Sequence, residues 1–162
     1  MIIIGKKQIG EGQPVFIIAE AGVNHNGRLD LALKLIDAAA DAGVDAVKFQ
    51  TFKAERLVTV GGEMAEYQKK NLKKVESQLA MLKKLELKEE FYPELIERSK
   101  ERGIIFLSSP FSGPDADFLE KLKVLAYKIG SGEITNLPFL MHVSQKRKPM
   151  IVSTGMSDLK EV

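Results

Sequence analysis

Short apolar runs alternate with amphipathic segments along most of the chain. The runs are continuous rather than alternating in polarity, as is typical of strands buried on both faces of a parallel sheet. We expect five such strands, at Val15–Glu20, Val44–Gln50, Ile104–Ser109, Leu125–Gly130 and Met150–Thr154. The order of these segments predicts repeated parallel strand–helix units.

The segments between the expected strands carry apolar residues at helical spacing. After the first strand, for example, apolar residues recur every three or four positions, and Gly43 follows at a position where helices commonly end. We expect helices at Leu29–Ala42, Ser77–Lys84, Lys88–Arg102, Pro114–Leu122 and Asn136–Gln145, with one further N-cap at Ser157 or Asp158. The polar stretch from Lys53 to about Glu76 is too long for an ordinary connection, so we interpret it as a functional or mobile excursion, partly helical.

The alternation alone fits either a doubly wound sheet or a (β/α)8 barrel. A barrel builds its active site from the carboxyl ends of strands all around the ring, whereas an open sheet concentrates ligands at one switch point. Every expected strand here ends in polar residues, namely Glu20, Lys48 with Gln50, Ser108 with Ser109, Lys128, and Ser153 with Thr154. We therefore expect an α/β fold: a partial (β/α)8 TIM barrel of about five parallel strands with connecting helices, preceded by a short N-terminal β segment. A complete barrel needs roughly 250 residues and eight strands, so we expect residues 1–162 to be its N-terminal part.

Composition narrows the class of protein. The chain has 162 residues, 44% hydrophobic and 28% charged, and a formal net charge of +2, so it resembles an ordinary globular protein without an electrostatic attraction to nucleic acid. Cysteine is absent, which excludes a disulfide scaffold and a thiolate metal site and fits a reducing cytoplasm. No apolar stretch is long enough to span a bilayer, and the start lacks the order of a signal peptide. We expect a cytoplasmic protein without nucleic-acid or membrane partners.

The segment KIGSGE, Lys128–Glu133, is the strongest candidate for a binding site. Glycines let backbone N–H groups approach an oxyanion, Ser131 adds a hydroxyl donor, and Lys128 adds a charge suited to phosphate. The alternative is an ordinary glycine turn beside a solvated lysine. Ser153-Thr154-Gly155 at the next strand end offers more hydroxyls and a helix N-terminus to the same anion, or is simply a cap and turn. We favour the anion site for the first segment.

Two other strand ends carry candidate residues. Lys48 and Gln50 share one face of a strand, with Phe49 on the other. A lysine that faces inward needs a partner, which we interpret as a carboxylate ligand rather than a salt bridge to Glu20. Ser108-Ser109-Pro110-Phe111-Ser112 either donates to phosphate or lines the pocket.

The segment Asn24-His25-Asn26-Gly27 follows the first strand and is either a simple turn or part of the site. His25 is a candidate acid/base or metal ligand, although one histidine makes no metal site. His142, the only other histidine, falls within an expected helix, where a structural role is favoured.

Taken together, these segments resemble the sialic acid synthase family. The matching stretches occur in family order over nearly the whole chain: IIAEAGVNHNG (17–27), DAVKFQTF (45–52), FLSSPFS (106–112), YKIGSGEITNLPFL (127–140) and IVSTGM (151–156). The resemblance implies a (β/α)8 barrel that condenses phosphoenolpyruvate with an N-acetylmannosamine-like sugar and releases phosphate. It also implies a divalent metal, Mn2+ or Mg2+, a C-terminal antifreeze-like domain, and domain-swapped homodimers.

The resemblance also assigns roles to residues of this chain. Lys48 is expected to hold the phosphoenolpyruvate carboxylate, and Gln50 and Glu133 to face the sugar and the reacting water. Glu20 and Asn24 are expected to line the floor of the site, with Glu20 and Glu133 as the catalytic candidates. The residues expected to hold the phosphate are Lys128, Ser131, Ser153 and Ser109, the last often Thr in the family.

The family's metal-binding histidines and antifreeze-like domain fall beyond Val162, so no metal ligand is expected within this chain. We expect a catalytic half that works as a homo-oligomer or with a complementing half. The alternatives are a non-catalytic half-barrel that binds phosphoenolpyruvate or a partner chain, and another phosphoenolpyruvate- or aldehyde-condensing barrel with a different sugar.

Overall fold

The computed structural model describes residues 1–58 and 77–162. Most of the expected excursion from Lys53 to about Glu76 lies outside the described residues, and only its first part is seen, as helix α2 (Ala54–Leu57). All five expected strands are present and parallel. β3 (Ile18–Gly22), β4 (Ala46–Thr51) and β5 (Ile105–Pro110) form one sheet, and β6 (Tyr127–Ile129) pairs with β7 (Met150–Val152).

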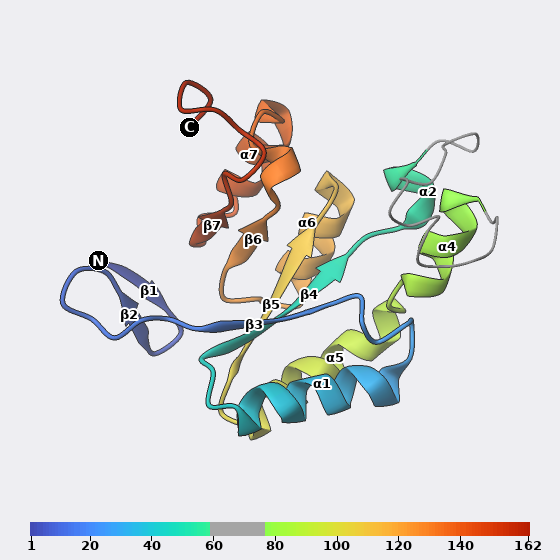
Figure 1. Cartoon of the computed structure of the whole chain (residues 1–162), viewed down its shortest axis with the longest axis horizontal. Coiled ribbons are helices and arrows are strands. Elements are labelled where there is room, and N and C mark those ends of the chain that lie inside the picture. The colour runs from blue at the N-terminus through green and yellow to red at the C-terminus, as the bar shows by residue number, and fades with distance from the viewer. Residues whose placement is uncertain (59–76) are drawn as a thin grey trace.

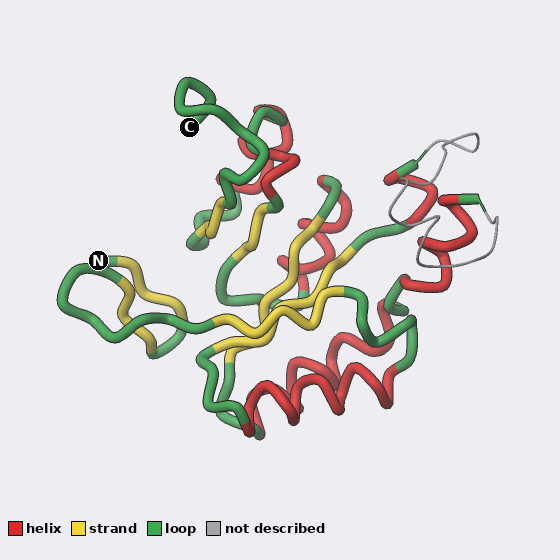
Figure 2. The backbone as a smooth tube through the Cα atoms, viewed as in Figure 1, coloured by secondary structure: helices red, strands yellow, loops and turns green. Residues whose placement is uncertain are grey.

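The two sheets form one curved row of strands. β5 and β6 lie side by side, although no hydrogen-bonded ladder joins them in the part of the chain that is described. In Figure 2 the yellow segments of β6 and β7 continue the row that β3, β4 and β5 begin. The architecture is thus the expected α/β partial barrel, with a break between its third and fourth strands.

Helices connect the strands where the apolar spacing predicts them. Their bounds are α1 Leu29–Asp41, α4 Gln78–Leu85, α5 Tyr92–Glu101, α6 Gly113–Lys121 and α7 Leu137–Ser144, with short 3-10 turns η1 Glu89–Phe91 and η2 Ser131–Glu133. Side chains cap three of them: Ser77, Ser112 and Asn136 each accept a backbone N–H from the first turn. Asp158 accepts the N–H groups of Lys160 and Glu161 as an N-cap would, although residues 157–162 form turns. No helix among the described residues is long and apolar enough to cross a membrane.

Several strands begin later than the apolar runs suggest. β3 starts at Ile18 because Val15 and Ile17 are exposed, and the Ile17 N–H donates to an Asp45 carboxylate oxygen. β6 likewise starts after the exposed Leu125. Apolar residues therefore extend past the starts of these strands, and Val15, Ile17 and Leu125 among them are exposed.

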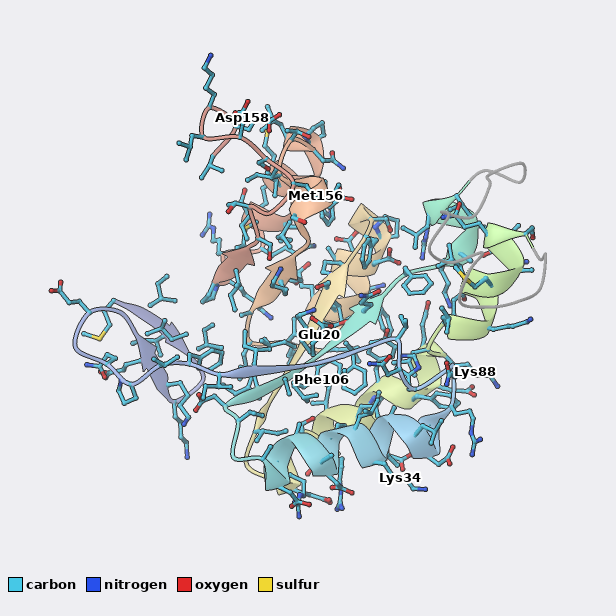
Figure 3. All side chains as sticks on the ribbon, viewed as in Figure 1. Glu20, Lys34, Lys88, Phe106, Met156 and Asp158 are labelled. Carbon is cyan, nitrogen blue, oxygen red and sulfur yellow. The ribbon has the colours of Figure 1, made fainter. Side chains whose placement is uncertain are left out.

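Each strand separates two apolar layers. On the outer side, residues such as Phe49, Phe106 and Leu95 form the main core against the helices. Figure 1 shows α1 and α5 side by side below β3–β5, and in Figure 3 Phe106 lies on that side of the strands while Glu20 lies on the other. On the inner side, a second cluster is built from Ile4, Ala46, Leu107 and Ala126.

The N-terminal β segment is a hairpin that closes one end of the partial barrel. β1 (Ile2–Ile4) and β2 (Lys7–Ile9) pair antiparallel, and Ile4 is 1% exposed against the inner cluster. The hairpin thus covers the amino-terminal end of the strands (Figure 1). Their carboxyl ends, which carry the polar residues, lie at the opposite end, as in other barrels of this type.

Candidate functional site

The inner side of the strands changes from apolar to polar along their direction. In β4, Ala46 belongs to the inner cluster, and Lys48 and Gln50 follow on the same side because side chains alternate along a strand. The register sets Lys48 opposite Glu20 of β3 and Gln50 opposite Ser109 of β5. The expected face is confirmed for Lys48 and Gln50, since Phe49 packs in the outer core.

Glu20 and Lys48 form an ion pair at this end of the sheet. Lys48 is buried, whereas the Glu20 side chain remains 56% exposed. A Cβ built on Gly22 would lie 3.2 Å from Glu20 Oε1 and 3.9 Å from Gln50 Nε2, so Glu20 and Gln50 both lie close to this glycine. The salt bridge considered as an alternative from the sequence is therefore present, and it occupies Lys48 with a carboxylate.

Lys128 of β6 lies close enough to that pair to be affected by both of its charges. Its Nζ donates to Ser153 Oγ at 2.5 Å and to the carbonyl oxygen of Ile129 at 2.7 Å. Burial lowers the pKa of Lys128, the positive charge of Lys48 lowers it further, and Glu20 opposes both. Lys48 and Lys128 therefore repel each other electrostatically. The carboxyl ends of the strands bring together two lysines and one carboxylate, that of Glu20. Such a cluster favours a ligand with several negative charges.

The segment after β6 folds as the short turn η2. Gly130 has an ordinary φ of −66°, and a Cβ added to it would meet no heavy atom within 4 Å. Neither backbone strain nor neighbouring atoms require a glycine here, so there is open space at Gly130, two residues after Lys128. Ser131 is half-buried, and Glu133 accepts a hydrogen bond from Asn136 Nδ2 at 2.7 Å.

The turn Asn24–Gly27 carries two exposed polar side chains, Asn24 and Asn26, and one buried polar side chain, His25. Asn24 is exposed, whereas His25 is 0% exposed with its ring 5.9 Å from that of Phe49, in the outer core. Burial lowers the pKa of His25 to about 4, against a weaker effect of the Gly22 carbonyl, so the ring is neutral near pH 7. Its Nδ1 accepts the Gly27 N–H at 3.0 Å. The geometry supports the turn interpretation for His25 and does not place it among the inner polar residues.

Gly27 fixes that turn against helix α4. Its φ is +71°, and a Cβ added to it would lie 2.6 Å from the carbonyl oxygen of Lys84. Both the backbone conformation and the close approach therefore require glycine. His142, in α7, bonds Asp117 of α6, in keeping with the structural role expected for it.

Ser108 and Ser109, treated together in the sequence, point to opposite sides of β5. Ser109 pairs with Gln50 and shares its inner side. Ser108 faces outward, where its Oγ lies 2.6 Å from Thr51 Oγ1, which in turn accepts a hydrogen bond from Tyr92 at 3.0 Å. Sequence reasoning missed Thr51 and Tyr92. The signal that could have found this difference is the alternation of side chains along a strand: Leu107 faces the inner side, so Ser108 faces outward and Ser109 inward.

Comparisons with known proteins extend over the same residues. The sequence model of the NeuB family matches residues 35–162. The N,N'-diacetyllegionaminic acid synthase of Legionella pneumophila is 53% identical over 160 residues, which cover 99% of this chain and 45% of that protein. The protein of the same name from Campylobacter jejuni is 51% identical over 146 residues, covering 90% and 44%.

A solved structure agrees with the fold. The N-acetylneuraminic acid synthetase of Leptospira borgpetersenii, solved with citrate, superposes with a TM-score of 0.85 at 34% identity. The match covers 99% of this chain and 51% of that one. The chain thus spans less than half the length of the two curated relatives and about half of the solved structure.

Proposed function

The chain belongs to the NeuB family, and from that premise we propose that it contributes to a transferase that condenses phosphoenolpyruvate with an N-acetylmannosamine-like sugar. The products are a sialic-acid-type nonulosonate and inorganic phosphate. The observation that carries the proposal is the convergence of Lys48, Lys128 and Ser153 with open space at Gly130, at the carboxyl end of the strands. Phosphoenolpyruvate, with a carboxylate and a phosphate, matches the two lysines.

In the proposed complex, each end of phosphoenolpyruvate has its own lysine. Lys48 takes the carboxylate in place of Glu20, whose exposed side chain is free to move away. Lys128 takes the phosphate together with the hydroxyls of Ser131, Ser153 and Ser109, and the empty volume beside Gly130 lets the ligand approach the backbone. Fixing both ends orients the enol carbon and lowers the entropic part of the barrier.

The sugar and water are proposed to bind between these anchors. Carbon 3 of phosphoenolpyruvate attacks the aldehyde carbon of the open-chain sugar, forming the new C–C bond as the C=O π bond breaks and the aldehyde oxygen takes up a proton. Water adds to the cationic carbon 2, and the tetrahedral intermediate expels phosphate by breaking the bond from carbon 2 to the phosphate oxygen. Gln50 is proposed to face the sugar, Glu133 to orient or deprotonate the water, and Glu20 and Asn24 to line the floor.

The divalent metal implied by the family does not fit the described residues alone. Across residues 1–58 and 77–162, no group of three or more His, Cys, Asp or Glu side chains is placed to hold a metal ion. We propose that the ligands for Mn2+ or Mg2+ belong to a second part of the barrel and that residues 1–162 form its N-terminal part, with an antifreeze-like domain following. The working protein is then a homo-oligomer or a pair of complementing halves in the cytoplasm.

A diacetylated sugar is the second candidate for the acceptor. The two relatives at 53% and 51% identity are both N,N'-diacetyllegionaminic acid synthases. A substrate panel that compares N-acetylmannosamine with a 2,4-diacetamido hexose decides between the two, since the phosphoenolpyruvate site is shared.

The test is sugar-dependent phosphate release from phosphoenolpyruvate with Mn2+. We would assay the 162-residue chain alone and the same chain co-expressed with the C-terminal half of a NeuB relative, with Lys128→Met as the matched inactive variant. We expect release from the co-expressed pair that depends on both the sugar and Lys128. Binding of phosphoenolpyruvate without release by any folded combination would contradict the transferase and favour the non-catalytic half-barrel.

A further inference from the structure

Three buried hydroxyl groups form a chain behind the ends of β4 and β5. Tyr92, from the first turn of α5, donates to Thr51 Oγ1 at 3.0 Å, and Thr51 Oγ1 lies 2.6 Å from Ser108 Oγ. All three residues are at most 5% exposed. The Tyr92 hydroxyl also lies 3.5 Å from the carbonyl oxygen of Gln50. The chain therefore links one helix to both strands at the level where each ends.

The strand ends need such a link because their backbone ladder stops there. The register pairs Gln50 with Ser109 and, one step further, Thr51 with Pro110. The Ile105 N–H donates to the Asp45 carbonyl oxygen beside β4, so by alternation position 110 faces away from β4, and the β4–β5 ladder ends at this pair. A cross-strand hydrogen bond between Thr51 and Ser108 supplies a tie on the outer side, and Tyr92 anchors that tie to α5.

Packing alone does not account for the Tyr92 hydroxyl. Its ring packs edge-on against Phe106 and Phe118, with centroid separations of 6.2 and 5.0 Å. A phenylalanine ring would make the same contacts, and a buried hydroxyl is unfavourable unless it is hydrogen-bonded. Burial also raises the pKa of Tyr92, so it stays a neutral donor. The hydroxyl is explained by its bond to Thr51.

The two residues next to the chain face the candidate site. Thr51 follows Gln50 and Ser108 precedes Ser109, and alternation sends Gln50 and Ser109 to the inner side. We propose that Tyr92, Thr51 and Ser108 are positioning residues, which hold the ends of β4 and β5 so that Gln50 and Ser109 keep a fixed separation across the site. The kinetic consequence rests on the proposed function, in which Ser109 meets the phosphate and Gln50 the sugar.

Amide hydrogen exchange tests the positioning without any activity. We expect Tyr92→Phe and Thr51→Val to speed exchange at the backbone amides of Gln50, Thr51 and Ser109 by about fivefold or more, because one buried hydrogen bond is lost. Thr51→Ser keeps the hydroxyl and is expected to exchange as the wild type does. Tyr127→Phe is the matched control, since it also removes a hydroxyl from a fully buried tyrosine, one that bonds Ala116 of α6 at 3.4 Å. Equal exchange at these strand ends in Tyr92→Phe and Tyr127→Phe would overturn the proposal.

Kinetics then separates this inference from the proposed function. In the active, complemented protein, we expect Tyr92→Phe and Thr51→Val to raise the KM for the sugar and lower kcat by about fivefold or more, with the effect restored in Thr51→Ser. A wild type that releases no phosphate contradicts the proposed function, while the exchange data still decide the positioning role. An active wild type whose kinetics match those of Tyr92→Phe overturns the positioning role alone.

Discussion

Glu20 and Lys48 face each other in the β3–β4 register, and their side chains form an ion pair between an exposed carboxylate and a buried ammonium group. Burial leaves Lys48 dependent on a negative partner, because an isolated buried charge is costly. Glu20 has no such need, since water reaches it. The pair is therefore asymmetric: an arriving carboxylate can replace Glu20 on Lys48 at little cost to Glu20.

Removing the Glu20 charge should strengthen phosphoenolpyruvate binding. In Glu20→Gln the ligand no longer competes with a carboxylate for Lys48, and a partly exposed pair of this kind is worth about 1 kcal/mol, or roughly a fivefold change in Kd. Titration calorimetry with phosphoenolpyruvate measures the change, and Glu94→Gln on the exposed side of α5 is the control. Weaker binding in Glu20→Gln would show that the ligand does not displace Glu20.

Gly130→Ala should weaken ligand binding without weakening the fold. Alanine adopts a φ of −66° readily, and its Cβ would meet no protein atom, so the free energy of unfolding should stay the same or rise by about 0.5 kcal/mol. The added methyl group occupies the space proposed for phosphate, so we expect the Kd for phosphoenolpyruvate to rise about tenfold or more. Urea denaturation and calorimetry separate the two effects.

Gly113→Ala provides the matched control for that variant. Gly113 also lacks a positive φ, and its added Cβ would meet the His142 ring at an ordinary 3.6 Å. We expect its Kd to equal that of the wild type. Unchanged affinity in Gly130→Ala would mean that the open space at Gly130 is not used by the ligand.

Phosphoenolpyruvate affinity should begin to fall at a lower pH than it would if Lys128 had the ordinary pKa of a lysine. Burial and the charge of Lys48 lower the pKa of Lys128, and only the protonated amine attracts phosphate. As the pH rises toward that lowered pKa, the fraction of charged Lys128 decreases and the Kd rises. Arginine stays charged throughout, so Lys128→Arg should show a flatter profile of Kd against pH between 7 and 10. Parallel profiles for the two proteins would contradict this assignment.

Stability should fall on acidification through His25. Its pKa is about 4 in the folded protein against 6.5 for the ordinary side chain, so the unfolded chain binds the proton first. The contribution is complete above pH 6.5, decreases as the pH falls toward 4, and amounts to about 3 kcal/mol at most. The urea midpoint of the wild type should therefore approach that of His25→Gln as the pH is lowered from 7 to 4. His142→Gln should keep the wild-type slope, and an unchanged slope in His25→Gln would refute the assignment.

The sequence predicted the strands, the helices and the site face for reasons visible in particular residues. Continuous apolar runs located all five parallel strands, and Gly43 ended α1 as expected, with φ +74°. The alternation around Phe49 correctly set Lys48 and Gln50 on the inner side. Lys128 and Ser153 were proposed for one anion, and they are hydrogen-bonded to each other. The roles of these residues in binding stay predictions.

Other features depended on contacts between distant segments and left little trace in the sequence. The start of β3 was placed too early because exposed Val15 and Ile17 look like strand residues. The Tyr92–Thr51–Ser108 chain joins positions up to 57 residues apart, so no local pattern marks it. The missing hydrogen-bonded ladder between β5 and β6 likewise has no signal in the apolar spacing.

The contact between Gly27 and helix α4 sets a rule for exchanging parts among related barrels. Because a methyl group at position 27 would collide with the Lys84 carbonyl, the turn that carries Asn24 and the end of α4 fit together as one piece. A chimera that imports one of them from a relative must import the other, or keep glycine at 27 and the same backbone path at 84–86. Loop grafting to change the acceptor sugar would thus transplant two segments that are more than fifty positions apart.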